Sequence, residues 1–157
     1  MKPASDIGLY FDSWDETFKK PFGAIERNSK VDFKISFEPT ISSKINRIDM
    51  ELFYEDKKMF IEMNHDSEFY YISWKFEHIG LYFYRFVIYI DHHRYFLAPE
   101  YLATGGLALL YEDEKAPSYQ LTVHGKIEKV PEFYSEGIVY QIFVDRFYKS
   151  QNANQKQ

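Results

Sequence analysis

Residues 31–37 read Val-Asp-Phe-Lys-Ile-Ser-Phe, so apolar and polar side chains alternate without a break. Because successive side chains of a β-strand point to opposite faces, the apolar residues of this stretch share one face and the polar residues share the other. This pattern is typical of an antiparallel strand with one face in a core and the other in solvent. The stretch therefore predicts a sheet protein whose core lies on one side of this strand.

Further segments have the same character and are separated by short turn signals. No helix of convincing length is indicated before residue 130, and the sequence has no internal repeat. Short strands with a turn every ~8–12 residues are typical of an all-β fold, here an immunoglobulin-like antiparallel β-sandwich. The predicted strands are residues 31–37, 45–54, 57–63, 69–76, 81–90, 94–97 and 119–123.

The segment 81–90 differs from the other predicted strands because both of its faces are apolar. One face carries aromatic and aliphatic residues throughout, and the other is interrupted by a single arginine. Such a strand usually has a layer covering its second face, for example a neighbouring domain, a subunit or a flat ligand. We therefore expect that second face to form an interface, through Leu81, Phe83, Val87 and Tyr89.

The composition argues against several classes of function. Aromatic residues make up 20% of the chain, which favours strands, and the net charge of -5 gives no electrostatic reason to bind nucleic acid or an anionic membrane. The chain has no cysteine, which excludes disulfide bonds and thiolate metal sites. It also lacks an apolar leader and any apolar run of about 18 residues, which predicts a cytoplasmic protein with no membrane partner.

A different pattern follows a loop with proline and glycine at residues 130–137. The segment 138–147 reads Ile-Val-Tyr-Gln-Ile-Phe-Val-Asp-Arg-Phe, and both of its faces are largely apolar, as in a parallel strand covered on both sides. A lone parallel strand has no sheet, so we expect its neighbours to lie beyond Gln157. We interpret Asp145 and Arg146 as a charge pair at the end of this strand rather than as catalytic groups.

This segment resembles the first strand of the catalytic barrel in glycoside hydrolase family 13, the α-amylase family. There a linker with proline and an aromatic residue precedes a strand reading V-x-Y-Q-I-F-P-D-R-F, and Val144 stands where the family has proline. The matching residues are Tyr140, Gln141, Ile142, Phe143, Asp145, Arg146 and Phe147.

The preceding part of the chain is similar to the module before the barrel in neopullulanases and cyclomaltodextrinases, often classed with family 34 carbohydrate-binding modules. That similarity rests on residues 12–16, 21–24, 81–84 and 119–123. The resemblance implies an N-terminal β-sandwich over residues 1–130. It also implies a linker with the first strand of a truncated (β/α)8 or TIM barrel over residues 131–157.

The resemblance also bears on catalysis. In this family an Asp nucleophile, a Glu acid/base and a further Asp lie on later barrel strands, so we expect no catalytic residue and no enzymatic activity in this chain. The parent enzyme is expected to be a retaining α-glycosidase, whose reaction needs two carboxyl groups about 5 Å apart. The loop at residues 148–154 has asparagine but no carboxylate, so we predict neither a metal nor a cofactor.

Two tryptophans are the candidate carbohydrate-binding residues, because sugar-binding modules hold glucose units against flat aromatic rings. Trp14 lies in a polar loop, where we favour an anchor that packs the loop over an exposed platform for a sugar. Trp74 alternates with apolar residues in its strand, which favours core packing. His92 and His93 follow Asp91 in a predicted turn, and we interpret them as solvated residues because adjacent side chains on a turn diverge too far to share a metal.

Three functions stay open from the sequence. The first, which we favour, is an accessory domain of an α-glucan-hydrolysing enzyme that packs on its own catalytic barrel or on a partner subunit, as in a homodimer. It would shape the substrate cleft and bind α-glucan or maltooligosaccharide weakly. The second is a free-standing α-glucan-binding module, which requires exposed, roughly coplanar rings. The third is a binding β-sandwich with no link to glycosidases.

Overall fold

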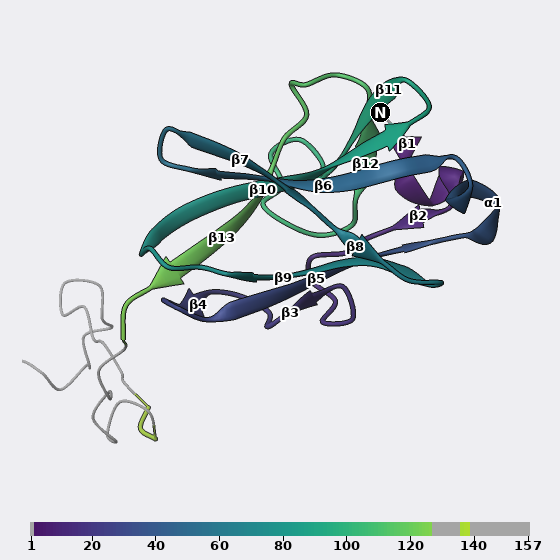
Figure 1. Cartoon of the computed structure of the whole chain (residues 1–157). Coiled ribbons are helices and arrows are strands. Elements are labelled where there is room, and N and C mark those ends of the chain that lie inside the picture. The colour runs from purple at the N-terminus through teal and green to yellow at the C-terminus, as the bar shows by residue number, and fades with distance from the viewer. Residues whose placement is uncertain (1, 127–135, 139–157) are drawn as a thin grey trace, which may run out of the picture. The chain divides into compact units, whose positions relative to one another are not determined.

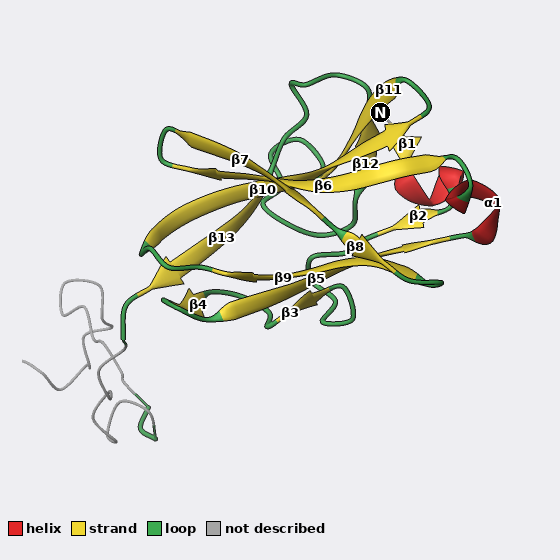
Figure 2. Ribbon diagram, viewed as in Figure 1, coloured by secondary structure: helices red, strands yellow, loops and turns green. Residues whose placement is uncertain are grey.

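Residues 2–126 form two β-sheets that lie over one another as two layers (Figure 1). The computed structural model describes residues 2–126 and 136–138 of the 157-residue chain. Figure 2 shows that strands dominate and that the helices are short. The elements are β1 (Lys2–Pro3), η1 (Ala4–Ile7), β2 (Leu9–Tyr10), β3 (Lys19–Lys20), β4 (Ile25–Glu26), β5 (Lys30–Phe37), α1 (Pro39–Ser42), β6 (Ile45–Tyr54), β7 (Lys57–Glu62), β8 (Asn64–His65), β9 (Phe69–Lys75), β10 (Gly80–Ile90), β11 (His93–Ala98), β12 (Leu109–Tyr111) and β13 (Tyr119–His124).

The larger sheet is organised around β10. On one side β10 pairs with β6 over nearly its whole length, and β7 follows at the edge beyond β6. On the other side β10 pairs with β13 through its first half and with β11 through its second half. Strands β12 and β1 continue the sheet beyond β11, and β4 adds a short parallel pair to β13.

The smaller sheet is organised around β5, the strand with the alternating sequence. It pairs with β9 along seven positions, and β8 follows β9. The opposite edge of β5 is covered by two short strands, β2 near its end and β3 near its beginning.

The main core lies between the two sheets. The alternation seen in the sequence is realised, because Val31, Phe33 and Ile35 on β5 have no exposed surface. They face buried residues of the larger sheet, and the rings of Phe33 and Tyr84 lie 4.9 Å apart between centroids. Tyr84 also packs near Phe86, so aromatic rings fill much of this layer. The prediction of an all-β, two-sheet fold is thus confirmed.

Two parts of the fold prediction remain predictions. The immunoglobulin-like connectivity is not established by the strand pairing alone. The predicted barrel strand, with its matching residues from Tyr140 to Phe147, lies outside the described residues.

The second face of β10 is covered partly by the chain itself. Val87 is fully buried in a second cluster formed by residues of β11, of β12 and of the segment that follows β12. It has no surface to offer a partner, which corrects the interface prediction at that position. Phe83 and Tyr89 are half-buried, and Leu81 is 44% exposed. The surface that remains for the predicted interface therefore lies toward the two ends of β10.

A buried arginine, Arg85, fixes the segment after β12 to the larger sheet. Arg85 on β10 pairs with the buried carboxylate of Glu51 on β6, which also accepts from Lys58. Its Nη1 donates hydrogen bonds to the backbone carbonyl oxygens of Glu114 at 2.8 Å and Ala116 at 2.6 Å. The arginine therefore joins the sheet to the covering segment while it neutralises a buried charge.

Replacing Arg85 with methionine should lower the free energy of unfolding by about 3 kcal/mol. The reason is that Glu51 would keep only the half-exposed Lys58 as an ion-pair partner, and two loop carbonyls would lose their donor. Urea unfolding followed by circular dichroism measures the loss. The control is Arg94→Met, which breaks an exposed ion pair with Glu114 and should cost less than about 1 kcal/mol. Similar losses in both variants would contradict this role of Arg85.

Candidate functional site

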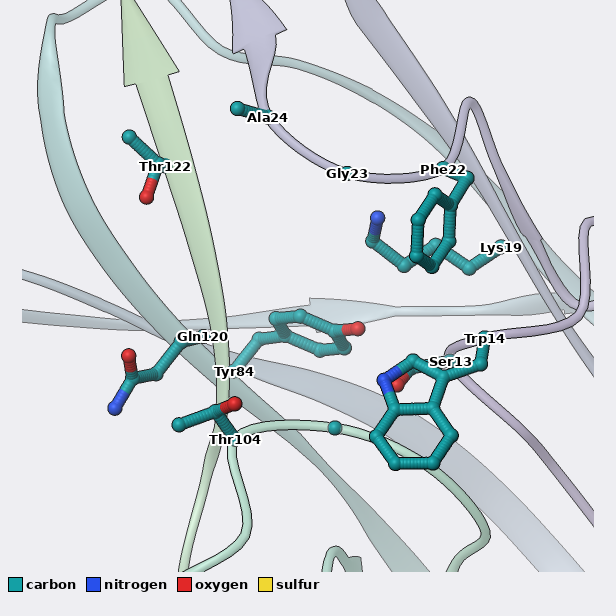
Figure 3. Close-up of a pocket in the computed structure, with 11 residues that line it drawn as sticks. Ser13, Trp14, Lys19, Phe22, Gly23, Ala24, Tyr84, Thr104, Gln120 and Thr122 are labelled. Carbon is teal, nitrogen blue, oxygen red and sulfur yellow. The ribbon is translucent and has the colours of Figure 1, made fainter. Parts of the chain in front are cut away.

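A pocket of about 240 Å³ opens at an edge of the sandwich to which both sheets contribute residues (Figure 3). Lys19 comes from β3 of the smaller sheet, and Tyr84 comes from β10 of the larger sheet. The remaining walls come from β13 and from three loops. The lining residues are Ser13, Trp14, Lys19, Phe22, Gly23, Ala24, Tyr84, Thr104, Gly105, Gln120 and Thr122.

Trp14 is an exposed ring on a loop that is held by hydrogen bonds. Its backbone N–H donates to the Asp12 carboxylate at 2.8 Å, and its side chain is 66% exposed. The neighbouring Ser13 joins this loop to another, because Ser13 Oγ accepts a hydrogen bond from the backbone N–H of Gly106 at 2.8 Å. The sequence favoured the anchor, whereas the exposure of the ring favours the platform.

Glycine allows the second loop to lie against the indole. A Cβ atom on Gly105 would stand 2.6 Å from Trp14 Nε1 and 2.9 Å from Ser13 Oγ, which is too close for either atom to stay in place. A Cβ on Gly106 would meet the indole ring at 3.4 Å, and the φ of +95° at Gly106 favours glycine as well. The loop backbone therefore supports one side of Trp14 while much of the ring stays open to solvent.

Phe22 adds a second exposed aromatic ring, on the same side of the pocket as Trp14 (Figure 3). Its side chain is 57% exposed, and its backbone N–H donates to Glu16 Oε1 at 3.1 Å. The pocket thus has two aromatic side chains at its opening. Polar side chains of Thr104, Gln120 and Thr122 lie on the other side.

Lys19 places a buried ammonium group in the pocket wall. The residue is 4% exposed, and its Nζ donates to the carbonyl oxygen of Pro21 at 3.2 Å. Among the described residues no carboxylate lies within ion-pair distance of it. Burial lowers the pKa of the Lys19 ammonium, and the nearby charge of Glu16 opposes that shift.

Tyr84 contributes a hydroxyl group that has no hydrogen-bond partner among the described residues. The side chain is fully buried, and its ring is stacked on Tyr119 with centroids 5.2 Å apart. Figure 3 shows the hydroxyl pointing toward the side of the pocket that holds Lys19 and Trp14. Burial raises the pKa of Tyr84 well above its ordinary value, so the group stays protonated and can donate.

The other predicted site residues lie elsewhere. Trp74 is half-buried on β9, packs against the main core and lines a different hollow, together with Tyr54 and His78. The structure therefore does not bring the two tryptophans together in the Trp14 pocket. His92 and His93 are exposed at the turn between β10 and β11, and the described residues contain no group of three or more His, Cys, Asp or Glu side chains that could hold a metal ion.

Sequence reasoning missed three members of this site: Lys19, Phe22 and Tyr84. Phe22 lies in the Pro-Phe-Gly-Ala stretch at residues 21–24, where proline and glycine indicate a loop. An aromatic residue in a loop is a signal that could have identified it. Tyr84 is one of 14 tyrosines, and nothing local distinguishes it from the others.

Comparison of the chain with family models, curated proteins and solved structures finds no match. In the part of the chain that the structure describes, no helix has the length and apolar character needed to span a membrane.

Replacing Gly105 with alanine should displace the Trp14 indole and lower the free energy of unfolding by about 1–3 kcal/mol, as overpacking does. In a Trp74→Phe background, the emission maximum of Trp14 should shift relative to the parent, and urea unfolding measures the stability. Gly125→Ala is the control, because its Cβ would meet only the flexible end of Ile79, at 3.3 Å. An unchanged emission spectrum in Gly105→Ala would show that the loop does not support the ring.

Replacing Tyr84 with phenylalanine should raise the free energy of unfolding by about 1 kcal/mol, because it removes a buried hydroxyl without a partner and retains the ring stack. Tyr111→Phe is the matched control. Its buried hydroxyl donates to the carbonyl oxygen of Pro99 at 2.7 Å, so the same change there should lower stability by about 1 kcal/mol. Urea unfolding of both variants gives the comparison, and a clear loss in Tyr84→Phe would mean that the hydroxyl is satisfied in solution.

Proposed function

We propose that this chain is the accessory N-terminal module of an α-glucan-hydrolysing enzyme and that it contacts the glucan through the Trp14 pocket. The observation that carries the proposal is the exposed, loop-supported indole of Trp14 at the opening of a pocket whose wall also contains the unsatisfied hydroxyl of Tyr84. The resemblance of residues 138–147 to the first barrel strand of the α-amylase family supports the choice of α-glucan as ligand.

The chemistry of the pocket fits one or two glucose units. The apolar C–H face of a glucose ring packs on an aromatic plane, and its hydroxyls need hydrogen-bond partners beside that plane. Trp14 and Phe22 supply the aromatic surface, and Thr104, Gln120 and Thr122 supply hydroxyl and amide groups opposite. A volume of about 240 Å³ is small, which favours weak contact with part of a chain over enclosure of a long oligosaccharide.

The proposed role of these residues is binding and positioning rather than catalysis. Hydrolysis with retention would take place on the barrel of the parent enzyme, through carboxyl groups on later barrel strands. A module that holds the chain near that barrel raises the local concentration of substrate at the active site.

A second candidate function is assembly through the outer face of the larger sheet. Phe83 on β10 lies directly opposite Phe53 on β6, with Leu81 two positions along on the same face. Phe60 on β7 is a diagonal neighbour of Phe53 and is 51% exposed. This apolar patch favours packing on the barrel or on a partner subunit, and such packing is compatible with a glucan site at the sandwich edge.

Titration with maltoheptaose and β-cyclodextrin tests the glucan proposal. A saturable change in tryptophan fluorescence is expected for the 157-residue chain, because binding would remove the exposed Trp14 ring from water. Trp14→Ala should weaken the affinity at least about tenfold, as the loss of a central aromatic contact does.

Trp74→Phe is the control variant, since Trp74 lines a different hollow and should not affect binding. Equal affinity of the parent and Trp14→Ala, measured by calorimetry so that no fluorophore is needed, would contradict the proposal. Saturable binding that Trp74→Phe abolishes instead would move the glucan site to the other hollow.

A further inference from the structure

Lys19 is a buried cation in the Trp14 pocket, and among the described residues no carboxylate lies within ion-pair distance of it. We propose that this pocket prefers a sugar that carries an anionic group, a phosphate ester or a carboxylate, and that Lys19 is the residue that recognises it. The inference rests on the proposed function, which makes a sugar the ligand, and it adds that this sugar carries a negative charge.

Lys19 makes fewer hydrogen bonds than its ammonium group can form. An ammonium group has three N–H donors, and this one has a single neutral acceptor, the carbonyl oxygen of Pro21. Because Lys19 lines the pocket, a ligand that enters it can supply the missing acceptors. A buried charge in this condition is unfavourable unless a partner neutralises it, and the lowered pKa of Lys19 reflects that cost.

The same protein provides an internal comparison. Arg85 is buried to a similar degree, 5% exposed, and it pairs with the carboxylate of Glu51. In that cluster the fold supplies the anion for its own buried cation. For Lys19 the described residues place no carboxylate in direct contact, and Glu16 acts on it only through its nearby charge, which leaves the contact position to a ligand anion.

The acidic residues near Lys19 are already engaged in holding their loop. Glu16 accepts from the backbone N–H of Phe22, Asp12 accepts from that of Trp14, and Asp15 accepts from that of Thr17. These carboxylates reduce the positive potential around the pocket. The preference therefore depends on direct contact between the ligand and the ammonium group rather than on long-range attraction.

A second hydrogen-bond donor of the pocket also favours an anionic ligand. The Tyr84 hydroxyl is buried, lacks a partner among the described residues and stays protonated, so it retains a free donor beside the pocket wall. Lys19 and Tyr84 belong to different sheets and line the same pocket. An ammonium group with N–H donors to spare and a hydroxyl without an acceptor match a group with several acceptor oxygens better than a neutral hydroxyl. Hydrogen bonds to such an ionised group are about twice as strong as neutral ones.

Calorimetric titration of the 157-residue chain at low salt tests the proposal with four probes: glucose, glucose 6-phosphate, glucuronate and inorganic phosphate. Glucose 6-phosphate or glucuronate should bind at least about tenfold more tightly than glucose, and this ratio should fall as salt is added. Comparison of the two anionic sugars tells a phosphate from a carboxylate. Inorganic phosphate should bind more weakly than glucose 6-phosphate, because it cannot use Trp14.

Variants assign the preference to one side chain. Lys19→Met, which retains the apolar stem, should reduce the ratio of anionic to neutral affinity to about one. Lys19→Gln is a second variant in case the first does not fold, as judged by urea unfolding. Lys20→Met is the matched control, because the adjacent Lys20 is exposed and should leave the ratio unchanged.

The possible results separate the two proposals. Equal affinity for glucose and both anionic sugars would overturn the anion preference and leave the glucan proposal intact. Binding of anionic sugars without any binding of maltoheptaose would support the role of Lys19 and overturn the glucan proposal. The anion preference through Lys19 would be overturned if inorganic phosphate bound as tightly as glucose 6-phosphate. It would also be overturned if the ratio of anionic to neutral affinity were unchanged in Lys19→Met.

Discussion

Strand β10 is the constraint on which the rest of the described structure depends. It pairs with β6 on one side and with β13 and β11 on the other. Its residues Tyr84 and Phe86 are buried against the smaller sheet, and Val87 is buried on the opposite face. A shift of one residue in its register would exchange these two faces, so both clusters hold β10 in a single position. The outer strands of the larger sheet are positioned by pairing with β10, with its neighbours or, for β1, with β12.

The Trp14 pocket is a consequence of this arrangement. Arg85 on β10 fastens the segment that follows β12, and the glycines of the loop before β12 lie against the loop that carries Trp14. Tyr84 extends from the centre of β10 toward the same edge. The hydroxyl beside the platform is thus set by β10, and the support of the platform is set by the loop that leads into β12.

Two groups in this pocket lower the stability of the protein. The Tyr84 hydroxyl and the Lys19 ammonium are buried with fewer hydrogen bonds than they can form, whereas the buried Glu51 is paired with two cations. Unsatisfied polar groups are rare in protein interiors, and those that persist call for an explanation such as a ligand. A binding role at this edge explains both groups together, which packing alone does not.

The sequence by itself determined the all-β class and the long strands, because an alternating pattern needs only residues two positions apart. Strands of two or three residues, such as β3 and β4, are too short to show that period and form because a neighbour is present. Trp14 was recognisable as an aromatic residue in a polar loop. The sequence did not identify Lys19 and Tyr84 as site residues, and it did not predict the segment that covers Val87. Those features depend on contacts between distant segments, such as Ser13 and Gly106, which are 93 positions apart, and packing at that range leaves no local pattern.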